Sequence, residues 1–152
     1  MMRRLLNCER GNSFIEMALA LPIIVGLLIG MVDISRAVST KLKLAQAAQR
    51  AVERVQRSGY TNSTDYKTAL ETEAETVAGT GSNATVTAWL ECGSSTTRLS
   101  FTANCSGTEP YSRHVDVTIT KPFTPLFGTQ FFPGANSDGT YTVSALAGMR
   151  VQ

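Results

Sequence analysis

The chain has 152 residues, with 14 basic and 12 acidic side chains and a formal net charge of +2. Residues 1–11 hold three of the basic side chains and one of the acidic ones, so residues 12–152 carry 14 − 3 = 11 against 12 − 1 = 11 and are formally neutral. This balance gives no sign of a basic nucleic-acid-binding surface, and the length argues against a second hydrophobic core beside one small domain.

An apolar run fills residues 14–32, and Glu16 is its one ionisable residue. Its nineteen residues are about the length that an α-helix needs to cross a hydrocarbon core roughly 30 Å thick. Three basic residues precede the run: Arg3, Arg4 and Arg10. The positive-inside rule therefore predicts an N-terminus in the cytoplasm and places residues from about Asp33 onward outside.

Glu16 is the informative residue of this run, because a carboxylate in the first turns of a membrane helix is disfavoured and usually marks function. If the chain were cut after Gly11, the new α-amino group of Asn12 would lie four residues from Glu16 on the same helical face. The two charges could then pair, or Glu16 could reach the amine of a neighbouring helix. The alternative is an interfacial Glu16 that extends to the lipid headgroups.

Residues 11–16, Gly-Asn-Ser-Phe-Ile-Glu, resemble the processing site of type IV prepilin peptidases. These enzymes cut after a glycine and favour a glutamate at the fifth position of the mature chain, which is the spacing of Gly11 and Glu16. The resemblance implies that Asn12 becomes the first mature residue. The expected parts are a cytoplasmic leader at residues 1–11, a transmembrane and assembly helix at 12–33, and an extracytoplasmic pilin-like domain at 34–152.

Two features inside the apolar run bear on how it packs. Pro22 removes the hydrogen bond to the Ala18 carbonyl, which predicts a kink or local melting of the helix. Gly26 and Gly30 form a GxxxG step, which permits close contact with another membrane helix.

The helical pattern continues beyond the membrane and predicts a single helix from Asn12 to about Arg57, with Gly59 where a helix usually ends. Apolar residues recur every three or four positions and make one face: Ile34, Val38, Leu42, Ala45, Ala48, Val52 and Val55. The commonest reason for such a stripe is packing against the chain's own sheet, and packing against a partner helix is second.

A second helix is expected from Asp65, as its N-cap, to about Val77. Its apolar face consists of Tyr66, Leu70, Ala74 and Val77. This face turns Glu71 and Glu75 away from the protein. Together with Glu73 they form an acidic run, which a solvated helix face explains better than a metal or acid–base site, because no histidine or aspartate converges on them.

From residue 84 the apolar period changes to two, which indicates strands. The expected strands cover residues 84–90, 98–103, 115–120 and 141–151, and Pro122 is expected to end the third of them. A disulfide between Cys92 and Cys105 would close a loop of about 14 residues and contribute around 3 kcal/mol in the chain-entropy model. It is favoured over two free thiols because this pair lies outside the cytoplasm, whereas Cys8 lies in the leader.

The segment between the last two strands, residues 121–140, is long for a loop, and such loops are often functional. It contains four phenylalanines and three prolines: Phe123, Phe127, Phe131, Phe132, Pro122, Pro125 and Pro133. The rings either cover the end of the domain's core or form a docking or membrane-dipping patch, since exposed apolar patches mark interfaces. Residues 136–139 have the composition of a turn and lack the further carboxylates of a calcium loop.

These elements predict an α+β fold. A long N-terminal helix, with a transmembrane half and an amphipathic half, is followed by a second short helix and a small antiparallel β-sheet packed on the long helix.

As a whole, the chain resembles a TadE-like minor pseudopilin of the tight-adherence (Flp) pilus, a relative of type IV pili. The resemblance rests on the Gly11 and Glu16 pattern, on the segment IEMALALPIIVGLLIGMVDISRAVSTKLKLAQAAQRA, and on the ending VDVTITKPFTPLFG followed by YTVSALAGMR. It implies processing by a prepilin peptidase and a single-pass position in the bacterial inner membrane. The partners that it implies are another minor pseudopilin, the major pilin and the inner-membrane assembly platform.

The preferred hypothesis is therefore a non-enzymatic minor pilin that assists pilus assembly and has no cofactor, metal or small-molecule substrate. An uncleaved, membrane-tethered envelope domain that binds a surface ligand or an assembly partner through the phenylalanine-rich loop is the second hypothesis. An enzyme is the weakest, because the one histidine, His114, has no triad or metal spacing around it.

Overall fold

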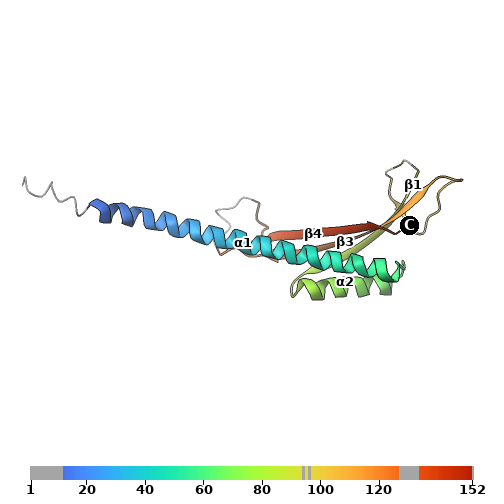
Figure 1. Cartoon of the computed structure of the whole chain (residues 1–152), viewed down its shortest axis with the longest axis horizontal. Coiled ribbons are helices and arrows are strands. Elements are labelled where there is room, and N and C mark those ends of the chain that lie inside the picture. Colours follow the sequence, from blue (N-terminus) through green and yellow to red (C-terminus); the bar gives the residue numbers. More distant parts are fainter. Residues whose placement is uncertain (1–11, 94, 96, 127–133, 152) are drawn as a thin grey trace, which may run out of the picture.

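The computed structural model describes residues 12–93, 95, 97–126 and 134–151. Its elements are the helices α1 (Asn12–Ser58) and α2 (Thr64–Ala78) and the strands β1 (Asn83–Cys92), β2 (Leu99–Ser100), β3 (Tyr111–Phe123) and β4 (Tyr141–Arg150). The strands pair antiparallel in the order β2-β1-β3-β4. The sheet and α2 lie against the C-terminal half of α1, and the N-terminal half of α1 extends away from them (Figure 1). The α+β fold predicted from the sequence is confirmed.

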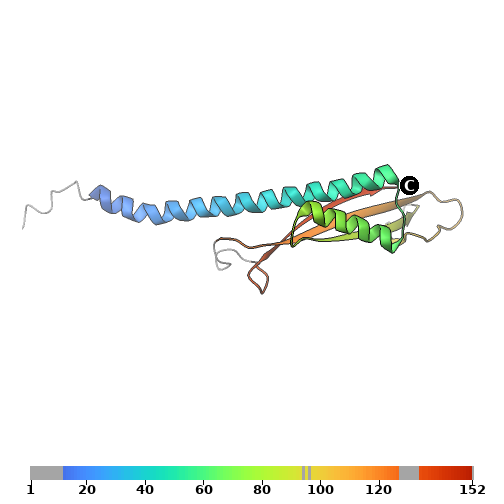
Figure 2. The ribbon, with the colours of Figure 1, turned by 90° about the horizontal axis from the view of Figure 1, so that it is seen from below.

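The first helix is one continuous element of 47 residues, which confirms the expected helix from Asn12 to about Arg57. It passes through Pro22 without a break, so the expected local melting is absent from this part of the chain. The helix bends in its blue N-terminal part (Figure 2), as expected where a proline removes one backbone hydrogen bond. Because the helix is unbroken, its two halves move together as one rigid element.

The second half of the predicted stripe packs on the sheet as expected, since Ala48 and Val55 are buried in the core and Ala45 and Val52 are partly buried against it, but the first half does not. Five side chains of α1 are buried in the core: Leu44, Ala47, Ala48, Ala51 and Val55. Ile34, Val38 and Leu42, which were expected on that face, are instead 61%, 52% and 58% exposed. The helix carries two apolar stripes, and the one with three alanines faces the sheet because small side chains let the helix backbone approach it closely.

The rest of the core comes from α2 and from alternate residues of the strands, as period-two patterning predicts. The buried residues that complete the core are Leu70, Ala74, Ala78, Ala84, Val86, Val115, Val117, Ile119 and Ala145. In the register, Val117 lies between Val86 of β1 and Ala147 of β4. Full burial of each larger side chain among them, such as leucine, isoleucine or valine, contributes about 1.5–3 kcal/mol to the stability of the fold.

The third strand runs past Pro122 to Phe123, so the prediction that Pro122 ends it was wrong. Strand β1 begins at Asn83, which pairs with Thr120, and from Lys121 onward β3 has only β4 as a neighbour. A proline is tolerated there because an edge position leaves one side of the strand without a partner that needs its N–H.

The N-cap of the second helix is Ser63 and not Asp65, so the helix begins at Thr64, two residues earlier than a cap at Asp65 would place it. The Ser63 hydroxyl oxygen accepts a hydrogen bond from the backbone N–H of Tyr66 at 3.2 Å. Serine and aspartate are both favoured N-cap residues, so the sequence alone does not decide between two of them that lie two positions apart.

Glu71 and Glu75 do not turn away from the protein, as the sequence had suggested. Their Oε1 atoms accept hydrogen bonds from the backbone N–H groups of Val86 and Ala84, each at 2.9 Å. These two N–H groups lie on the edge of β1 where β2, which pairs only at Trp89 and Leu90, does not reach. The carboxylates thus take the place of a neighbouring strand and protect an edge that could pair with another chain.

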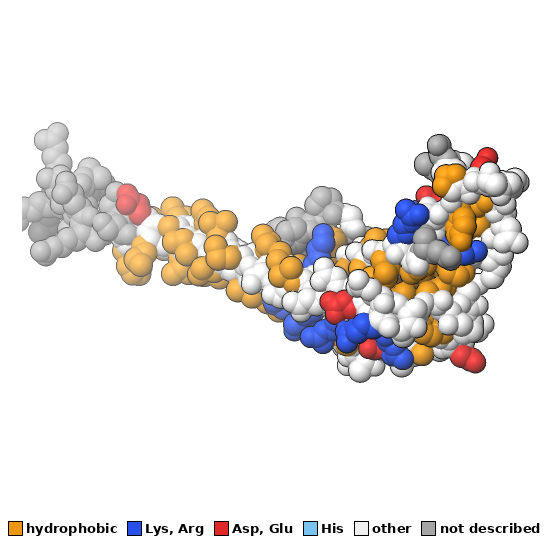
Figure 3. Space-filling view, turned by 45° about the vertical axis from the view of Figure 1, so that its right-hand side comes forward, with side chains coloured by type: hydrophobic (Ala, Val, Ile, Leu, Met, Phe, Trp, Pro, Cys, Tyr) orange, Lys and Arg blue, Asp and Glu red, His pale blue; other side chains and the backbone are white. Residues whose placement is uncertain are grey.

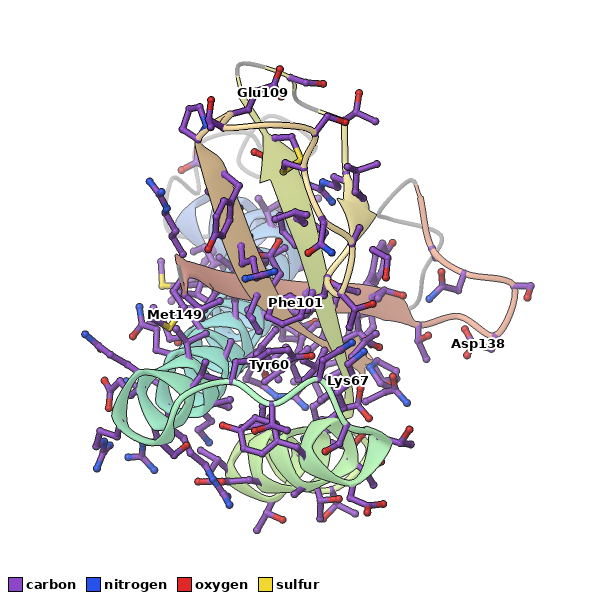
Figure 4. All side chains as sticks on the ribbon, turned by 90° about the vertical axis from the view of Figure 1, so that its right-hand side faces the viewer. Tyr60, Lys67, Phe101, Glu109, Asp138 and Met149 are labelled. Atoms are coloured by element: carbon purple, nitrogen blue, oxygen red, sulfur yellow. A yellow bond between two sulfur atoms is a disulfide. The ribbon has the colours of Figure 1, made fainter. Side chains whose placement is uncertain are left out.

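The end of the protein away from the extended helix is closed by an aromatic cluster and a disulfide. The Tyr60 ring lies 5.7 Å from that of Tyr66 and 4.8 Å from that of Phe101, both edge-on, and Figure 4 shows Tyr60 and Phe101 between the helices and the strands. Burial raises the pKa of the Tyr60 hydroxyl to about 12. The disulfide joins Cys92 and Cys105, with Cα atoms 5.6 Å apart, as predicted.

Replacing Glu71 and Glu75 together by alanine should expose the edge of β1. Each lost hydrogen bond should lower the free energy of unfolding by about 1 kcal/mol, and the amides of Ala84 and Val86 should exchange faster with solvent. Urea unfolding and hydrogen exchange of the full chain in detergent micelles measure both effects.

Glutamine at the two positions keeps an amide oxygen as acceptor and should restore most of the protection. Glu73→Ala is the matched control, because the Glu73 carboxylate forms its ion pair with Arg54 and not with β1. Unchanged exchange at the β1 edge in the double alanine variant would contradict the assigned role.

Candidate functional site

The expected processing site lies at the start of α1. Gly11 is outside the described residues, and Asn12 is the first residue of the helix. Glu16 follows one turn later, and its side chain is exposed. The backbone is therefore already helical between the expected cleavage point and Glu16, which puts positions 12 and 16 on one face.

The apolar residues 14–32, called the membrane-length segment below, have no core of their own. None of the most apolar window of α1 is buried in the protein, and this window is long and apolar enough to cross a membrane. Figure 3 shows it as a band of hydrophobic side chains on a bare helix. In water this surface would cost about 25 cal/mol for each Å² of apolar area, so it needs lipid or partner helices around it.

Gly26 and Gly30 face open space. A Cβ atom added at either position would meet no atom within 4 Å in the described structure. Packing within this chain therefore does not account for the two glycines, and the predicted role in contact with another helix stays a prediction.

Asp33 is the residue that sequence reasoning missed. It follows the membrane-length segment directly, yet it is only 3% exposed. Both carboxylate oxygens accept hydrogen bonds from the backbone N–H of Leu126, at 3.0 Å for Oδ1 and 2.8 Å for Oδ2. The Arg36 guanidinium donates to Oδ1 at 3.3 Å. Because a buried carboxylate is stable only when such donors replace water, Asp33 holds the chain around Leu126 against the helix.

A signal for Asp33 was present in the sequence. Asp33, Ala37, Thr40 and Leu44 are spaced by four, three and four residues, which continues the buried stripe of α1 toward the membrane. A single acid on the buried face of a helix is a candidate for a specific partner. The identity of the partner, a backbone N–H 93 positions later, had no local signal.

An apolar hollow of about 350 Å³ lies beside Asp33. Six further residues form its walls: Ile34, Ala37, Phe123, Pro125, Tyr141 and Val143. Phe123 is half-buried, and the Arg36 guanidinium lies over its ring, 5.5 Å from the centroid. Phe123 therefore covers this end of the sheet, as one of the two interpretations of the phenylalanine-rich loop proposed.

The remainder of that loop is described in part. Phe127, Phe131, Phe132 and Pro133 lie outside the described residues, and their docking role stays a prediction. At 136–139 the expected turn is present: the Asn136 N–H donates to the Thr140 carbonyl at 2.8 Å, and the Gly139 N–H donates to the Asn136 carbonyl at 3.0 Å.

His114 lies on the face of the sheet that the helices do not cover. Its ring stacks on that of Trp89 with centroids 5.5 Å apart, and Arg98 lies over Trp89 at 4.1 Å. The His114 Nε2 atom is 3.1 Å from the Ser112 hydroxyl and 3.8 Å from a carboxylate oxygen of Glu91. Among the described residues no group of histidine, cysteine or acidic side chains has the arrangement of a metal site. The side chains of His114, Trp89 and Arg98 therefore form a stack on the surface of the sheet.

Comparison with known protein families places the first third of the chain. Residues 11–53 match the model of the TadE-like protein family. No curated protein and no solved structure matches the chain. The TadE-like segment contains Gly11, Glu16, Gly26, Gly30 and Asp33 and reaches into the buried stripe of α1. It associates the chain with the tight-adherence pilus system, and its long apolar helix fits a single-pass membrane protein there.

Asp33→Ala should release the chain around Leu126. Removing a buried acceptor that serves charged and backbone donors costs about 1–3 kcal/mol, so the free energy of unfolding should fall by that amount and the Leu126 amide should exchange faster. Asp33→Asn, which keeps one oxygen acceptor, should lose less. Ser35→Ala, two residues along the same helix, is the control, and an equal effect there would contradict a specific tie.

Asp116 gives a pH dependence of known sign. Burial raises the pKa of this carboxyl above 3.8, with Arg98 and His114 acting in the opposite direction. Ionisation of Asp116 therefore opposes folding: the penalty is absent below pH 3.8 and is complete once the pH exceeds the raised pKa. Asp116→Asn should gain thermal stability over the unmodified chain as the pH is raised from 3 toward 7, roughly across that window.

Asp138 supplies a control of opposite sign. Hydrogen bonds from the hydroxyl and N–H of Thr140 lower the pKa of its carboxyl, so Asp138→Asn should lose stability at neutral pH and match the unmodified chain in acid. Melting curves at several pH values measure the thermal stability of both variants. A difference for Asp116→Asn that does not change with pH would contradict the assignment.

Proposed function

We propose that the chain is a non-enzymatic minor pilin of a tight-adherence pilus. It is synthesised with residues 1–11 as a leader, cut after Gly11 by a prepilin peptidase, and held in the bacterial inner membrane by α1 until it assists assembly. The match of residues 11–53 to the TadE-like family supports this function, together with the position of Glu16 in the otherwise apolar run 14–32.

The position of Glu16 is the observation that carries the proposal. An ionised acid near the centre of a membrane helix costs about 2.5–3.5 kcal/mol on insertion scales, and less toward the edge. A cut after Gly11 would create an ammonium group at Asn12, one helical turn from Glu16, on this chain or on a neighbour. An ion pair with that ammonium offsets the cost of the carboxylate and at the same time sets the register between adjacent helices.

The surface of α1 offers a place for such neighbours. Exposed apolar side chains continue from the membrane-length segment into the second half of the helix, at the positions Leu27, Met31, Ile34, Val38 and Leu42. This stripe lies on a different face from the buried alanines, so a second helix can pack there without disturbing the sheet. A second pseudopilin and the major pilin are the proposed partners along the stripe, and the inner-membrane assembly platform is the proposed partner at the cytoplasmic side.

The orientation rests on the disulfide and on the processing motif. Charge alone does not decide it, because the three arginines of the leader face four basic residues on α1 within eighteen positions of the other end: Arg36, Lys41, Lys43 and Arg50. The Cys92–Cys105 disulfide persists in an oxidising compartment, and the peptidase motif requires its glycine in the cytoplasm. Both support a cytoplasmic N-terminus and an extracytoplasmic sheet.

Mass spectrometry of the protein isolated from cells with an active prepilin peptidase should give Asn12 as the N-terminus. Glu16→Ala should remain processed but fail to enter or support pili. A charged hydrogen bond of about 2 kcal/mol corresponds to about a thirtyfold loss of incorporation. Glu53→Ala, an exposed glutamate on the same helix, is the matched control. An intact Met1, or normal pili with Glu16→Ala, would leave an uncleaved tethered domain as the better description.

A further inference from the structure

A cationic groove of about 430 Å³ lies between α1 and the end of β3. Arg36 and Lys43 line it from α1, and Lys121 lines it from β3. Three hydroxyl side chains of α1 are also in its lining: Ser35, Ser39 and Thr40. None of the described residues that line the groove is acidic. Cations beside hydroxyl donors are the groups with which proteins bind phosphate.

The helix fixes the distance of this groove from the membrane. Asp33 follows the membrane-length segment, and Arg36 and Lys43 follow three and ten residues later, which is about 5 and 15 Å along the helix. Side chains of a helix tilt toward its N-terminus, here toward the membrane. Arg36 therefore lies at the level of a headgroup layer about 5–8 Å thick, and the side chain of Lys43 extends back toward that layer.

The groove and the apolar hollow beside Asp33 share Phe123 as a common wall. Along α1 the hollow comes first, with Ile34 and Ala37 in its wall, and the groove extends further, to Lys43. A phospholipid in the adjacent leaflet presents its groups in the same order, with its apolar part toward the membrane core and its phosphate toward the water. The two cavities together thus match one amphipathic ligand.

Basic side chains are also concentrated at this level of the molecule. Figure 3 shows Lys and Arg side chains gathered along α1 beyond the apolar band. On the far side of a membrane, basic residues next to a membrane helix are disfavoured by the positive-inside rule. A local anionic partner removes that conflict.

We propose that this groove binds the phosphate of an anionic phospholipid in the outer leaflet of the membrane that α1 spans, an inference that rests on the proposed function for the orientation of the chain. The bound lipid fixes the tilt and the rotation of the sheet relative to the membrane, since the groove walls belong to both α1 and β3. Asp33 keeps the end of β3 and the following residues beside the helix, and so keeps the two walls together.

The test uses the full chain in nanodiscs that contain equal amounts of phosphatidylglycerol and phosphatidylcholine. Native mass spectrometry after gentle release counts the lipids that stay bound. We expect phosphatidylglycerol to be retained in preference, and Lys43→Gln to lower that preference about fivefold, as a lysine near an anionic lipid surface contributes about that factor. Lys41→Gln is the matched control, because Lys41 is exposed two residues away on the same helix and does not line the groove.

Equal retention of the two lipids by the unmodified chain, or an equal loss with Lys41→Gln, would overturn the proposal. A second arm adds excess inorganic phosphate: retained phosphatidylglycerol supports a lipid site, whereas its complete displacement would assign the groove to free phosphate and overturn the lipid. The proposed pilin function can be rejected independently of the lipid site. A chain that keeps Met1 and still selects phosphatidylglycerol would support the lipid site and contradict processing after Gly11. A chain with Asn12 at its N-terminus and no lipid preference would support processing and contradict the lipid site.

Discussion

The structure depends on one constraint: α1 is a single unbroken helix that must serve two environments. The most apolar window of its first half is not buried in the protein and requires lipid or other helices. Its second half supplies one side of the core through Leu44, Val55 and the alanines between them. Because no hinge separates the halves, the position of the sheet is set by the helix, and any tilt of the membrane-length segment is passed to the sheet.

The junction between the two halves is where polar chemistry is concentrated. Asp33 is buried, bonded to the backbone at Leu126 and to Arg36, and it comes directly after the last residue of the membrane-length segment. Phe123 and Arg36 then form the boundary between an apolar hollow and a cationic groove. The carboxylate replaces water for a backbone N–H and so ties the chain after β3 to α1, beside the walls of the hollow and the groove. The same contact that stabilises the fold therefore shapes the surface nearest to the membrane.

The opposite edge of the sheet is handled by a different device. Strand β2 has two residues and covers only the end of β1, and two glutamates of α2 satisfy the next N–H groups along that edge. A protein that assembles beside other subunits benefits from such protection, because an open strand edge pairs with any available chain. Under the proposed function, contacts with other subunits are left to the exposed helix stripe, where side chains and not backbone groups decide the partner.

Local pattern determined most of the elements from the sequence. The length of α1, the period-two strands, the Cys92–Cys105 disulfide and the α+β class all follow from spacing, composition and compartment. The same holds for Glu16, whose oddity in an apolar run is visible without a structure. The processing role of Gly11, Asn12 and Glu16 and the part played by Gly26 and Gly30 stay predictions, because they concern an enzyme and partner helices that this single chain does not contain.

Only the tertiary structure decided which contacts the elements make. α1 has two apolar stripes of similar period, and the sheet selects the one rich in alanine because a close approach buries more surface. Three findings depend on residues far apart in the chain. Leu126 donates a hydrogen bond to Asp33, Glu71 and Glu75 accept hydrogen bonds from β1, and Pro122 fits into β3 because β1 does not extend beside it. No local pattern carries such information, since a side chain's partner is fixed by the fold and not by its neighbours in sequence.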